Sequence, residues 1–255
     1  MGAYFNAVSA DNPSNWWRLA DPGGIIGTDI GGATHVPLFV NSAQAAPYTG
    51  PSSDGASTVH DSVNPSLYNV TNPIPLLNLW TIECWVWFFR TGVDMTVMTI
   101  ENEGVGQRNV IRFEAARTIF FFSTLGTSTM RYNTAVSDMT WHHFAMTYDH
   151  VTLRGYLDGV QVASVATVIN TTGNVSVRIG EEQGASVKAL GFFSDAAYYN
   201  ATLTAGQLLA HYNAADLVTV PPLYIGGGTF DVTLGSTTGV SGDLATIRNS
   251  VRRTY

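Results

Sequence analysis

Glu101 and Glu103 are the closely spaced carboxylates of this sequence whose separation best suits acid–base chemistry. Side chains at i and i+2 of a strand project from the same face, so the two carboxyl groups would lie side by side in an extended segment. Retaining glycoside hydrolysis uses such a pair, about 5–5.5 Å apart, as nucleophile and acid/base. Gly104 and Gly106 follow directly, however, which favours a solvated turn at the end of a strand. We therefore predict that the chain has no catalytic residues and is not an enzyme.

The remaining residues that could carry chemistry do not form a known catalytic, metal-binding or phosphate-binding motif. The sequence contains no Gly-x-Ser-x-Gly elbow, His-Glu-x-x-His, Cys-x-x-Cys or phosphate-binding loop. His142 and His143 are adjacent in an apparent strand, so they face opposite ways and cannot share a metal ion; we expect one packed and one surface histidine. Cys84, the single cysteine, lies in an apolar run and is expected to be a buried thiol.

Composition excludes several classes of function. Of the 255 residues, 45% are hydrophobic and 12% charged, and the net charge is −7. A nucleic-acid surface needs clustered lysine and arginine, so no nucleic-acid partner is expected. No run approaches the ~18 apolar residues of a membrane span, so we expect no membrane insertion. The first residues show no basic start followed by an apolar stretch, so no signal peptide is seen.

The elements that would position these residues are mostly strands. In Trp80–Phe89, alternation places Ile82, Cys84, Val86 and Phe88 on one face and Trp85, Trp87 and Phe89 on the other. This predicts a central strand covered on both sides, or a strand with one face that closes an interface. Asp158-Gly159 separates two apolar runs and predicts a hairpin, and Asp149 is likewise expected in a turn. Further strands are expected at Met95–Ile100, Asn109–Glu114, Thr118–Ser123, Thr127–Asn133, Trp141–Tyr148, Leu153–Leu157, Val160–Thr167 and Val175–Ile179. Trp17, Trp80, Trp85 and Trp141 are expected in the core.

One short helix and an appended tail complete the expected organisation. Thr204 can cap a helix over Ala205–Ala214, in which Leu208, Leu209 and Tyr212 would form the apolar stripe. We expect one domain over residues 1–216 and a C-terminal extension over 217–255. In this extension three apolar residues recur at helical spacing and are candidates for docking onto a partner: Leu244, Ile247 and Val251.

Several stretches together carry a family resemblance. They are Trp17-Arg18-Leu19-Ala20-Asp21, Gly27-Thr28-Asp29-Ile30-Gly31-Gly32, Leu79-Trp80-Thr81-Ile82-Glu83-Cys84-Trp85-Val86, Thr140-Trp141-His142-His143-Phe144-Ala145-Met146-Thr147-Tyr148-Asp149, Gly155-Tyr156-Leu157-Asp158-Gly159-Val160, Val177-Arg178-Ile179-Gly180, Gly191-Phe192-Phe193 and Tyr199-Asn200-Ala201-Thr202-Leu203-Thr204. Over residues 14–215 the sequence resembles a laminin G-like, concanavalin A-like lectin/glucanase domain. The resemblance implies an all-β jelly-roll sandwich of two antiparallel sheets. The Glu-x-Asp-x-x-Glu pattern of the glucanase branch is absent.

The resemblance also implies candidate ligand sites. Many relatives bind calcium through carboxylates, and Asp29 on the opening loop is the candidate ligand here. The Asp-Glu pair common in the family's closing strand is replaced by Ser194-Asp195, which argues against a family-type calcium site. For a sugar, exposed aromatic rings would supply stacking surfaces, with core packing as the alternative for each candidate. These candidates are Tyr48, Trp87, Tyr132 and Tyr198.

For the role of the protein, the resemblance favours a virion component. A Trp-Arg-Leu opening and a "Tyr-Asn…Leu-Thr…His-Tyr" close, here between Tyr199 and Tyr212, look like those of bacteriophage minor tail proteins. We therefore expect a structural or binding module at the virion surface, in a tail tip, fibre or decoration protein. Its expected partners are other virion proteins, further copies of itself and a host glycan. The alternatives are a carbohydrate-binding lectin domain of a cellular or secreted protein and, less favoured, a glycosidase.

Overall fold

The structure of the chain is a computed structural model. The described residues are 2–19, 26–27, 30–31, 38–40, 48–49, 56–60, 68–69, 74–75, 78–88, 94–102, 107–115, 118–123, 128–133, 135–137, 140–169, 174–181, 191–215 and 217. The chain divides into two compact units, Met1–Pro222 and Leu223–Tyr255. The second unit lies outside the described residues, so the division at residue 217 and the docking role of Leu244, Ile247 and Val251 stay predictions.

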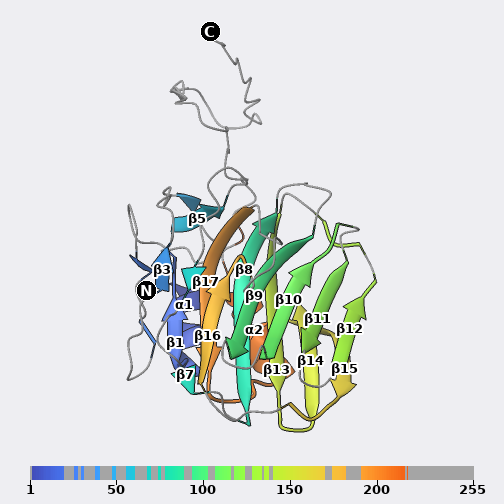
Figure 1. The fold of residues 1–255 in the computed structure, drawn as a ribbon. Coiled ribbons are helices and arrows are strands. Elements are labelled where there is room, and N and C mark those ends of the chain that lie inside the picture. The colour runs from blue at the N-terminus through green and yellow to red at the C-terminus, as the bar shows by residue number, and fades with distance from the viewer. Residues whose placement is uncertain are drawn as a thin grey trace, which may run out of the picture. The chain divides into compact units, whose positions relative to one another are not determined.

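Two antiparallel sheets form the first unit (Figure 1). The first sheet contains, in spatial order, β15 (Val160–Ala166), β14 (Thr152–Leu157), β13 (Trp141–Tyr148), β8 (Trp80–Phe88), β17 (Gly191–Tyr199), β5 (Ala56–His60) and β4 (Tyr48–Thr49), and β1 (Asn15–Trp17) pairs with β17. The second sheet contains β12 (Ser128–Tyr132), β11 (Ile119–Ser123), β10 (Gln107–Phe113), β9 (Met95–Asn102), β16 (Asn174–Ile179), β6 (Tyr68–Asn69), β3 (Leu38–Val40) and β2 (Ile26–Gly27), and β7 (Ile74–Pro75) pairs with β16. The predicted antiparallel sandwich is confirmed.

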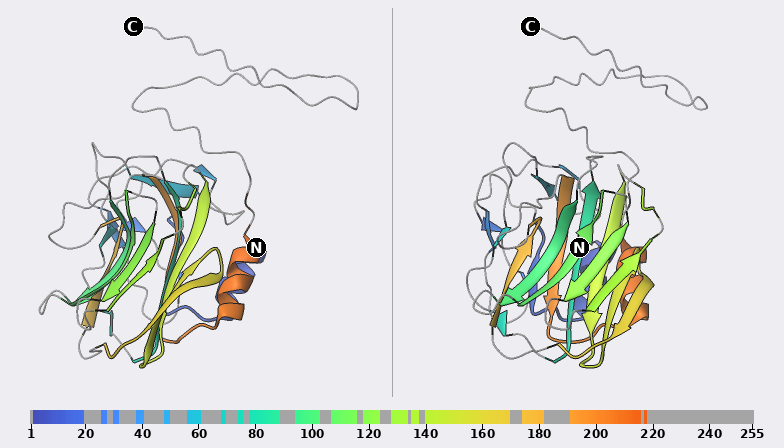
Figure 2. Two further views of the ribbon diagram at one scale, coloured as in Figure 1. Left: turned by 90° about the vertical axis from the view of Figure 1, so that its right-hand side faces the viewer. Right: turned by 45° about the vertical axis from the view of Figure 1, so that its right-hand side comes forward.

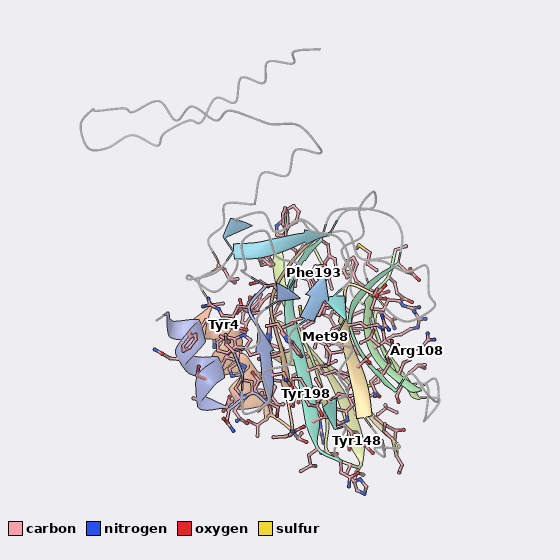
Figure 3. The ribbon with its side chains drawn as sticks, turned by 60° about the vertical axis from the view of Figure 1, so that its left-hand side comes forward. Tyr4, Met98, Arg108, Tyr148, Phe193 and Tyr198 are labelled. Atoms are coloured by element: carbon pink, nitrogen blue, oxygen red, sulfur yellow. The ribbon has the colours of Figure 1, made fainter. Side chains whose placement is uncertain are left out.

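The interior between the sheets is apolar and follows the predicted alternation. Ile82, Cys84, Val86 and Phe88 of β8 belong to the main hydrophobic cluster. Figure 3 shows Met98 of β9, Phe193 and Tyr198 of β17 among the side chains between the layers. Phe88 stacks on Phe113 of the opposite sheet with ring centroids 4.2 Å apart. The two layers are thus joined by a continuous aromatic and aliphatic core. Of the four predicted core tryptophans, all are buried: Trp17, Trp80, Trp85 and Trp141.

The hairpin predicted at Asp158-Gly159 is confirmed. Asp158 and Gly159 both have positive φ, 52° and 75°, as a two-residue type I′ hairpin turn requires. Gly159 is also packed closely, since a Cβ atom there would lie 2.8 Å from the backbone of Leu209. Asp149 also lies in a turn, where its carboxylate accepts hydrogen bonds from the backbone N–H groups of Val151 and Thr152.

Two helices cover the outer face of the first sheet (Figure 2). The predicted helix is α2 (Ala205–Ala214), and Thr204 caps it through a capping box with Gln207. Its buried side chains are Leu208 and His211, whereas Leu209 is 41% exposed, so the predicted stripe was wrong at Leu209.

The expectation of a single helix was also wrong. The additional helix, α1 (Ala3–Ala10), buries Tyr4 and Val8, which lie one turn apart on the same side. A helix of eight residues is marginal alone, and here the sheet supports it: the Tyr4 ring lies edge-on to those of Trp16 and Trp85 at 6.4 and 6.1 Å.

Candidate functional site

A buried carboxylate, Glu83, forms the centre of a polar cluster on the outer face of the first sheet. Glu83 alternates with Ile82 and Cys84 along β8, so it points away from the interior and toward the helices. Its Oε2 lies 3.0 Å from Nε2 of His143 and 3.0 Å from Nδ1 of His211. The hydroxyl of Tyr199 donates a hydrogen bond to Oε1. The Glu83, His143 and His211 side chains are fully buried, so the carboxylate is satisfied without solvent.

His211 connects the sheet to the N-terminal segment. Its Nε2 lies 2.9 Å from Oδ2 of Asp11, just after α1, while its Nδ1 faces Glu83. Ionised carboxylates only accept hydrogen bonds, so both ring nitrogens carry hydrogen and the side chain is an imidazolium. Gln207, one turn earlier in α2, donates a 2.7 Å hydrogen bond to the other oxygen of Asp11. We call Asp11, Glu83, His143, Tyr199 and His211 the histidine cluster.

The pKa shifts in the histidine cluster follow from this arrangement. Burial alone would lower the pKa of His211, but the negative charge of Glu83, and then that of Asp11, raises it from 6.5 to about 9. Burial alone would raise the pKa of Glu83, yet the charge of His211 and the hydrogen bonds from both histidines hold it well below its usual value. Burial and the adjacent Glu83 raise the pKa of Tyr199 well above 10. Glu83 and His211 therefore form an ionised pair at neutral pH.

Aromatic rings pack around the histidine cluster between the first sheet and the helices. Trp85 lies 5.0 Å from His143 and stacks on Tyr212 of α2 at 5.7 Å between ring centroids. Tyr4 of α1 packs on the same indole. The Glu83 carboxylate is therefore closed to solvent, and the cluster attaches the helices to the sheet.

A second polar cluster lies on the outer face of the second sheet, and it contains Glu101, one of the two carboxylates weighed above for acid–base chemistry. Glu101 of β9 is 1% exposed, and its Oε1 accepts a hydrogen bond from Arg178 of β16. Arg108, directly opposite in β10, places its Nε 3.7 Å from the other oxygen. Arg178 also bonds Glu181 at 3.0 Å. We call these four residues the arginine cluster. Figure 3 shows Arg108 on the side of the domain away from Tyr4 of α1.

The solvated turn predicted at Glu101 was therefore wrong. The strand β9 continues through Asn102, two residues beyond its predicted end, and cross-strand pairing with Arg108 and Ser176 keeps Glu101 inside the sheet. Glu103, the second carboxylate of the pair considered for acid–base chemistry, lies outside the described residues.

The structure removes two of the four aromatic candidates for sugar stacking. Tyr198 is 0% exposed and belongs to the core. Trp87 is 4% exposed and packs edge-on against Phe192, 5.4 Å between ring centroids. Neither ring has a face open to a ligand, so core packing is the correct interpretation of both. Tyr132 of β12 is half-buried against the core, and the side chain of Tyr48 is not described.

The remaining predicted residues have mixed outcomes. His142 is 7% exposed rather than a surface histidine: its Nδ1 lies 2.8 Å from Asp158, and its Nε2 lies 2.9 Å from the Ser137 hydroxyl. The predicted opposite orientation of His142 and His143 is confirmed, since His143 faces Glu83 instead. Cys84 is a buried free thiol, as predicted. The calcium candidate Asp29 lies outside the described residues, and within those described no group of His, Cys, Asp and Glu side chains is arranged to hold a metal ion.

Comparison with known proteins places this architecture in a family. The model of the family described as "Concanavalin A-like lectin/glucanases superfamily" matches residues 63–208. No curated protein matches the sequence. Among the helices that the structure describes, none has the length and apolar character needed to cross a membrane.

Similar folds occur in solved structures of larger proteins. A sialidase from Trypanosoma rangeli, in complex with 2,3-difluoro-KDN, superposes with a TM-score of 0.59 at 14% identity, over 79% of this chain and 32% of the sialidase chain. The binding domain of botulinum neurotoxin serotype D superposes with a TM-score of 0.58 at 11% identity, over 81% of this chain and 52% of that chain. This chain thus spans about a third and about half of these proteins, and the likeness is one of fold alone.

Proposed function

This chain belongs to the concanavalin A-like lectin/glucanases superfamily, and from this membership we propose that it works as a non-enzymatic structural and binding module of a bacteriophage virion. In this role it is part of a tail tip, fibre or decoration protein and is exposed at the particle surface. Its partners are other virion proteins and further copies of itself. The same fold serves catalytic and binding proteins alike, so the proposal depends on the side chains rather than on the fold.

The observation that supports a non-catalytic role is the state of Glu83 and Glu101, the buried glutamates at the centres of the two clusters. Glu83 is held by two histidines and a tyrosine, and Glu101 is held between two arginines. A glycosidase needs one carboxyl group with a raised pKa that can donate a proton, next to a second that is ionised. The pKa of Glu83 is instead lowered, which suits a fixed structural charge.

The test of catalysis is hydrolysis of β-glucans and of host-wall polysaccharide. We expect no release of reducing sugar above that of a heat-denatured control. Hydrolysis that disappears in Glu101→Gln and in Glu103→Gln would overturn the non-enzymatic proposal and restore the glycosidase.

The virion role is supported by the resemblance of the opening and closing segments to phage minor tail proteins, and by the separate C-terminal unit Leu223–Tyr255. We propose that residues 217–255 dock the domain onto the particle, with Leu244, Ile247 and Val251 as the apolar contacts. Particles assembled with the full chain and with a chain that ends at residue 216 are purified, and the protein in each is quantified. Loss of the shortened chain from particles is expected. Equal incorporation would contradict the docking role.

A carbohydrate-binding role, in a virion or in a cellular protein, is the second candidate, and the lectin-like fold favours it. Among the aromatic candidates for sugar stacking whose side chains are described, Tyr132 is the one that is partly exposed. Asp29 is the candidate calcium ligand. A glycan array with and without calcium tests this role. Binding that is lost in Tyr132→Ala or in Asp29→Ala would support it, and no binding in either condition would remove it.

A further inference from the structure

Three polar side chains near the start of β13 are joined by hydrogen bonds, and none of them belongs to either cluster described above. Nε2 of His142 lies 2.9 Å from the Ser137 hydroxyl, and Nδ1 of His142 lies 2.8 Å from Oδ2 of Asp158. Ser137 precedes β13, His142 is part of it, and Asp158 lies in the turn between β14 and β15. A hydroxyl, an imidazole and a carboxylate joined in this order form the arrangement that activates a serine as a nucleophile.

The hairpin turn fixes the carboxylate of this group. Oδ1 of Asp158 accepts a 2.9 Å hydrogen bond from the backbone N–H of His143, so one oxygen is held by β13 while the other faces His142. An ionised carboxylate only accepts hydrogen bonds, so Nδ1 of His142 carries the hydrogen that lies between them. In the neutral ring this arrangement leaves Nε2 as a base directed toward Ser137.

Packing holds the histidine in place and leaves the serine open. His142 is buried, and its ring lies edge-on to that of Phe144, with the ring centroids 6.3 Å apart. Val136, directly before Ser137, is buried in the main hydrophobic cluster and anchors this part of the backbone. Ser137 itself is exposed. A reagent in solution can therefore reach the hydroxyl, while the base beside it is already oriented.

The backbone carbonyl of Ser137 completes the surroundings of the histidine ring. Its oxygen lies 3.0 Å from Nε2 of His142. When the ring takes a proton from the hydroxyl, the new N–H at Nε2 can donate to this carbonyl, and Nδ1 continues to donate to Asp158. Both N–H groups of the imidazolium then have an oxygen partner, which stabilises the charge that forms on the ring.

A serine activated in this way reacts with carbonyl compounds that carry a good leaving group. We propose that Ser137 is a modification site that accepts an acyl group from an activated carboxylic ester, with His142 as general base and Asp158 as its positioning residue. Oγ of Ser137 forms a bond to the carbonyl carbon, and the bond from that carbon to the leaving oxygen breaks. The hydroxyl proton moves to Nε2 of His142 and then to the leaving group. The products are an ester on Ser137 and a free alcohol.

This inference goes beyond the proposed function and is independent of it. The uptake of one acyl group per chain modifies the protein without turnover, so it agrees with a non-enzymatic module. The three residues are also distinct from Glu83 and Glu101, so the hydrolysis of glycosides and the acylation of Ser137 are separate tests.

The experiment measures acetylation of the full chain by p-nitrophenyl acetate at neutral pH. Peptide mapping by mass spectrometry follows the acetylated fraction of individual serines over time. Ser164 of β15 is also exposed and serves as the control within the same molecule. We expect Ser137 to be acetylated about a hundredfold faster than Ser164 or more, which is the range that a positioned general base contributes. Equal rates at the two serines in the native chain would overturn the inference.

Two variants separate an activated serine from a set of structural hydrogen bonds. His142→Gln removes the base. Asp158→Asn retains a residue that tolerates positive φ in the turn, but an amide no longer fixes the hydrogen on Nδ1 of His142. Each variant should slow acetylation of Ser137 by about a hundredfold, with the rate at Ser164 unchanged.

Thermal unfolding verifies that both variants fold. Folded variants that acetylate Ser137 at the native rate would overturn the inference, because hydrogen bonds that only support the hairpin would affect stability and not this rate. The comparison of Ser137 with Ser164 in the native chain decides the matter even where a variant does not fold.

Discussion

The two sheets each bury one glutamate on the face that points away from the sandwich interior, and they neutralise it in different ways. Glu83 is held by groups from distant parts of the chain, His143 and His211, which lie 60 and 128 residues away. Glu101 is held within its own sheet, by Arg108 directly opposite on the neighbouring strand and by Arg178 on the other side. The histidine cluster thus joins helices to a sheet, whereas the arginine cluster joins strands that backbone hydrogen bonds already connect.

The difference shows which charges the fold depends on. Removing one partner of a fully buried ion pair leaves an uncompensated buried charge. The resulting loss in the free energy of unfolding is far larger than the net contribution of the intact pair. The arginine cluster is closer to solvent, since the Arg108 side chain is 28% exposed. Substitutions in the two clusters should therefore lower the free energy of unfolding by different amounts and with a different pH dependence. They should also destabilise different parts of the molecule.

The largest effect is expected for Glu83→Ala, which leaves the His211 imidazolium between Asp11 and an empty space. We expect a loss of about 3–5 kcal/mol in the free energy of unfolding, measured by urea denaturation at pH 7. Glu83→Gln keeps the shape and some hydrogen bonds, and should cost less. A loss below about 1 kcal/mol for Glu83→Ala would show that the cluster does not hold the helices in place.

The second effect is a pH dependence of the free energy of unfolding, to which the histidine cluster should contribute and the arginine cluster should not. Because the folded pKa of His211 is about 9 against an ordinary 6.5, its contribution is complete below pH 6.5 and is lost as the pH rises through 9. The guanidinium groups of the arginine cluster keep their charge over this range. The free energy of unfolding should therefore fall from pH 6.5 to pH 9 in the native chain.

The control for this pH dependence is His211→Gln, which removes the titrating group while retaining a polar side chain. Its free energy of unfolding should be lower at pH 6.5 and should fall less steeply toward pH 9. Parallel curves for the two proteins would assign the pH dependence to other groups.

A smaller effect is expected for Glu101→Ala in the arginine cluster. Arg178 retains Glu181, 3.0 Å away, and Arg108 can turn toward water, so we expect a loss of about 1–3 kcal/mol in the same urea measurement. The double variant with Glu83→Ala should be additive, since the two glutamates lie on outer faces of different sheets. A loss larger than that of Glu83→Ala would reverse the comparison.

The smallest effect is expected at the exposed end of α2. Thr204→Ala removes the side-chain oxygen that caps the helix and should cost about 1 kcal/mol. Gln207 also contacts Asp11, so Gln207→Ala tests whether the cap and the histidine cluster are coupled. A double-mutant cycle between Gln207→Ala and Asp11→Ala measures this coupling, and a coupling energy near zero would make the cap an independent feature.

Local patterns in the sequence predict most of the central fold. Trp141–Tyr148 was predicted with the bounds observed, because a run rich in aromatic residues ends at the turn residue Asp149. The Asp158-Gly159 hairpin and α2 followed from turn and capping chemistry, which involves residues only a few positions apart. The helix α1 was missed because its eight residues bury only Tyr4 and Val8, and Gly2 provides no side-chain cap.

The histidine cluster could not be assembled from spacing. Glu83 was visible as an acidic residue inside the apolar run Trp80–Phe88, which in itself indicates that a buried partner is needed. Its partners, however, come from another strand and from a helix near the end of the domain, and no local rule relates those positions. Likewise, the burial of Trp87 and Tyr198 depends on what covers the two faces of the sheet, which alternation alone does not state.

The shared position of α1 and α2 has a consequence for how the domain can be attached to anything else. The two helices that the structure describes lie against each other on one face, linked by the bridge from Asp11 through His211 to Glu83. Polypeptide joined before α1 or after α2 would therefore connect to the domain beside this bridge. A pull that separates the two helices from the first sheet would have to break the contacts of the His211 imidazolium with Asp11 and Glu83, while the second sheet would keep its own strand pairing.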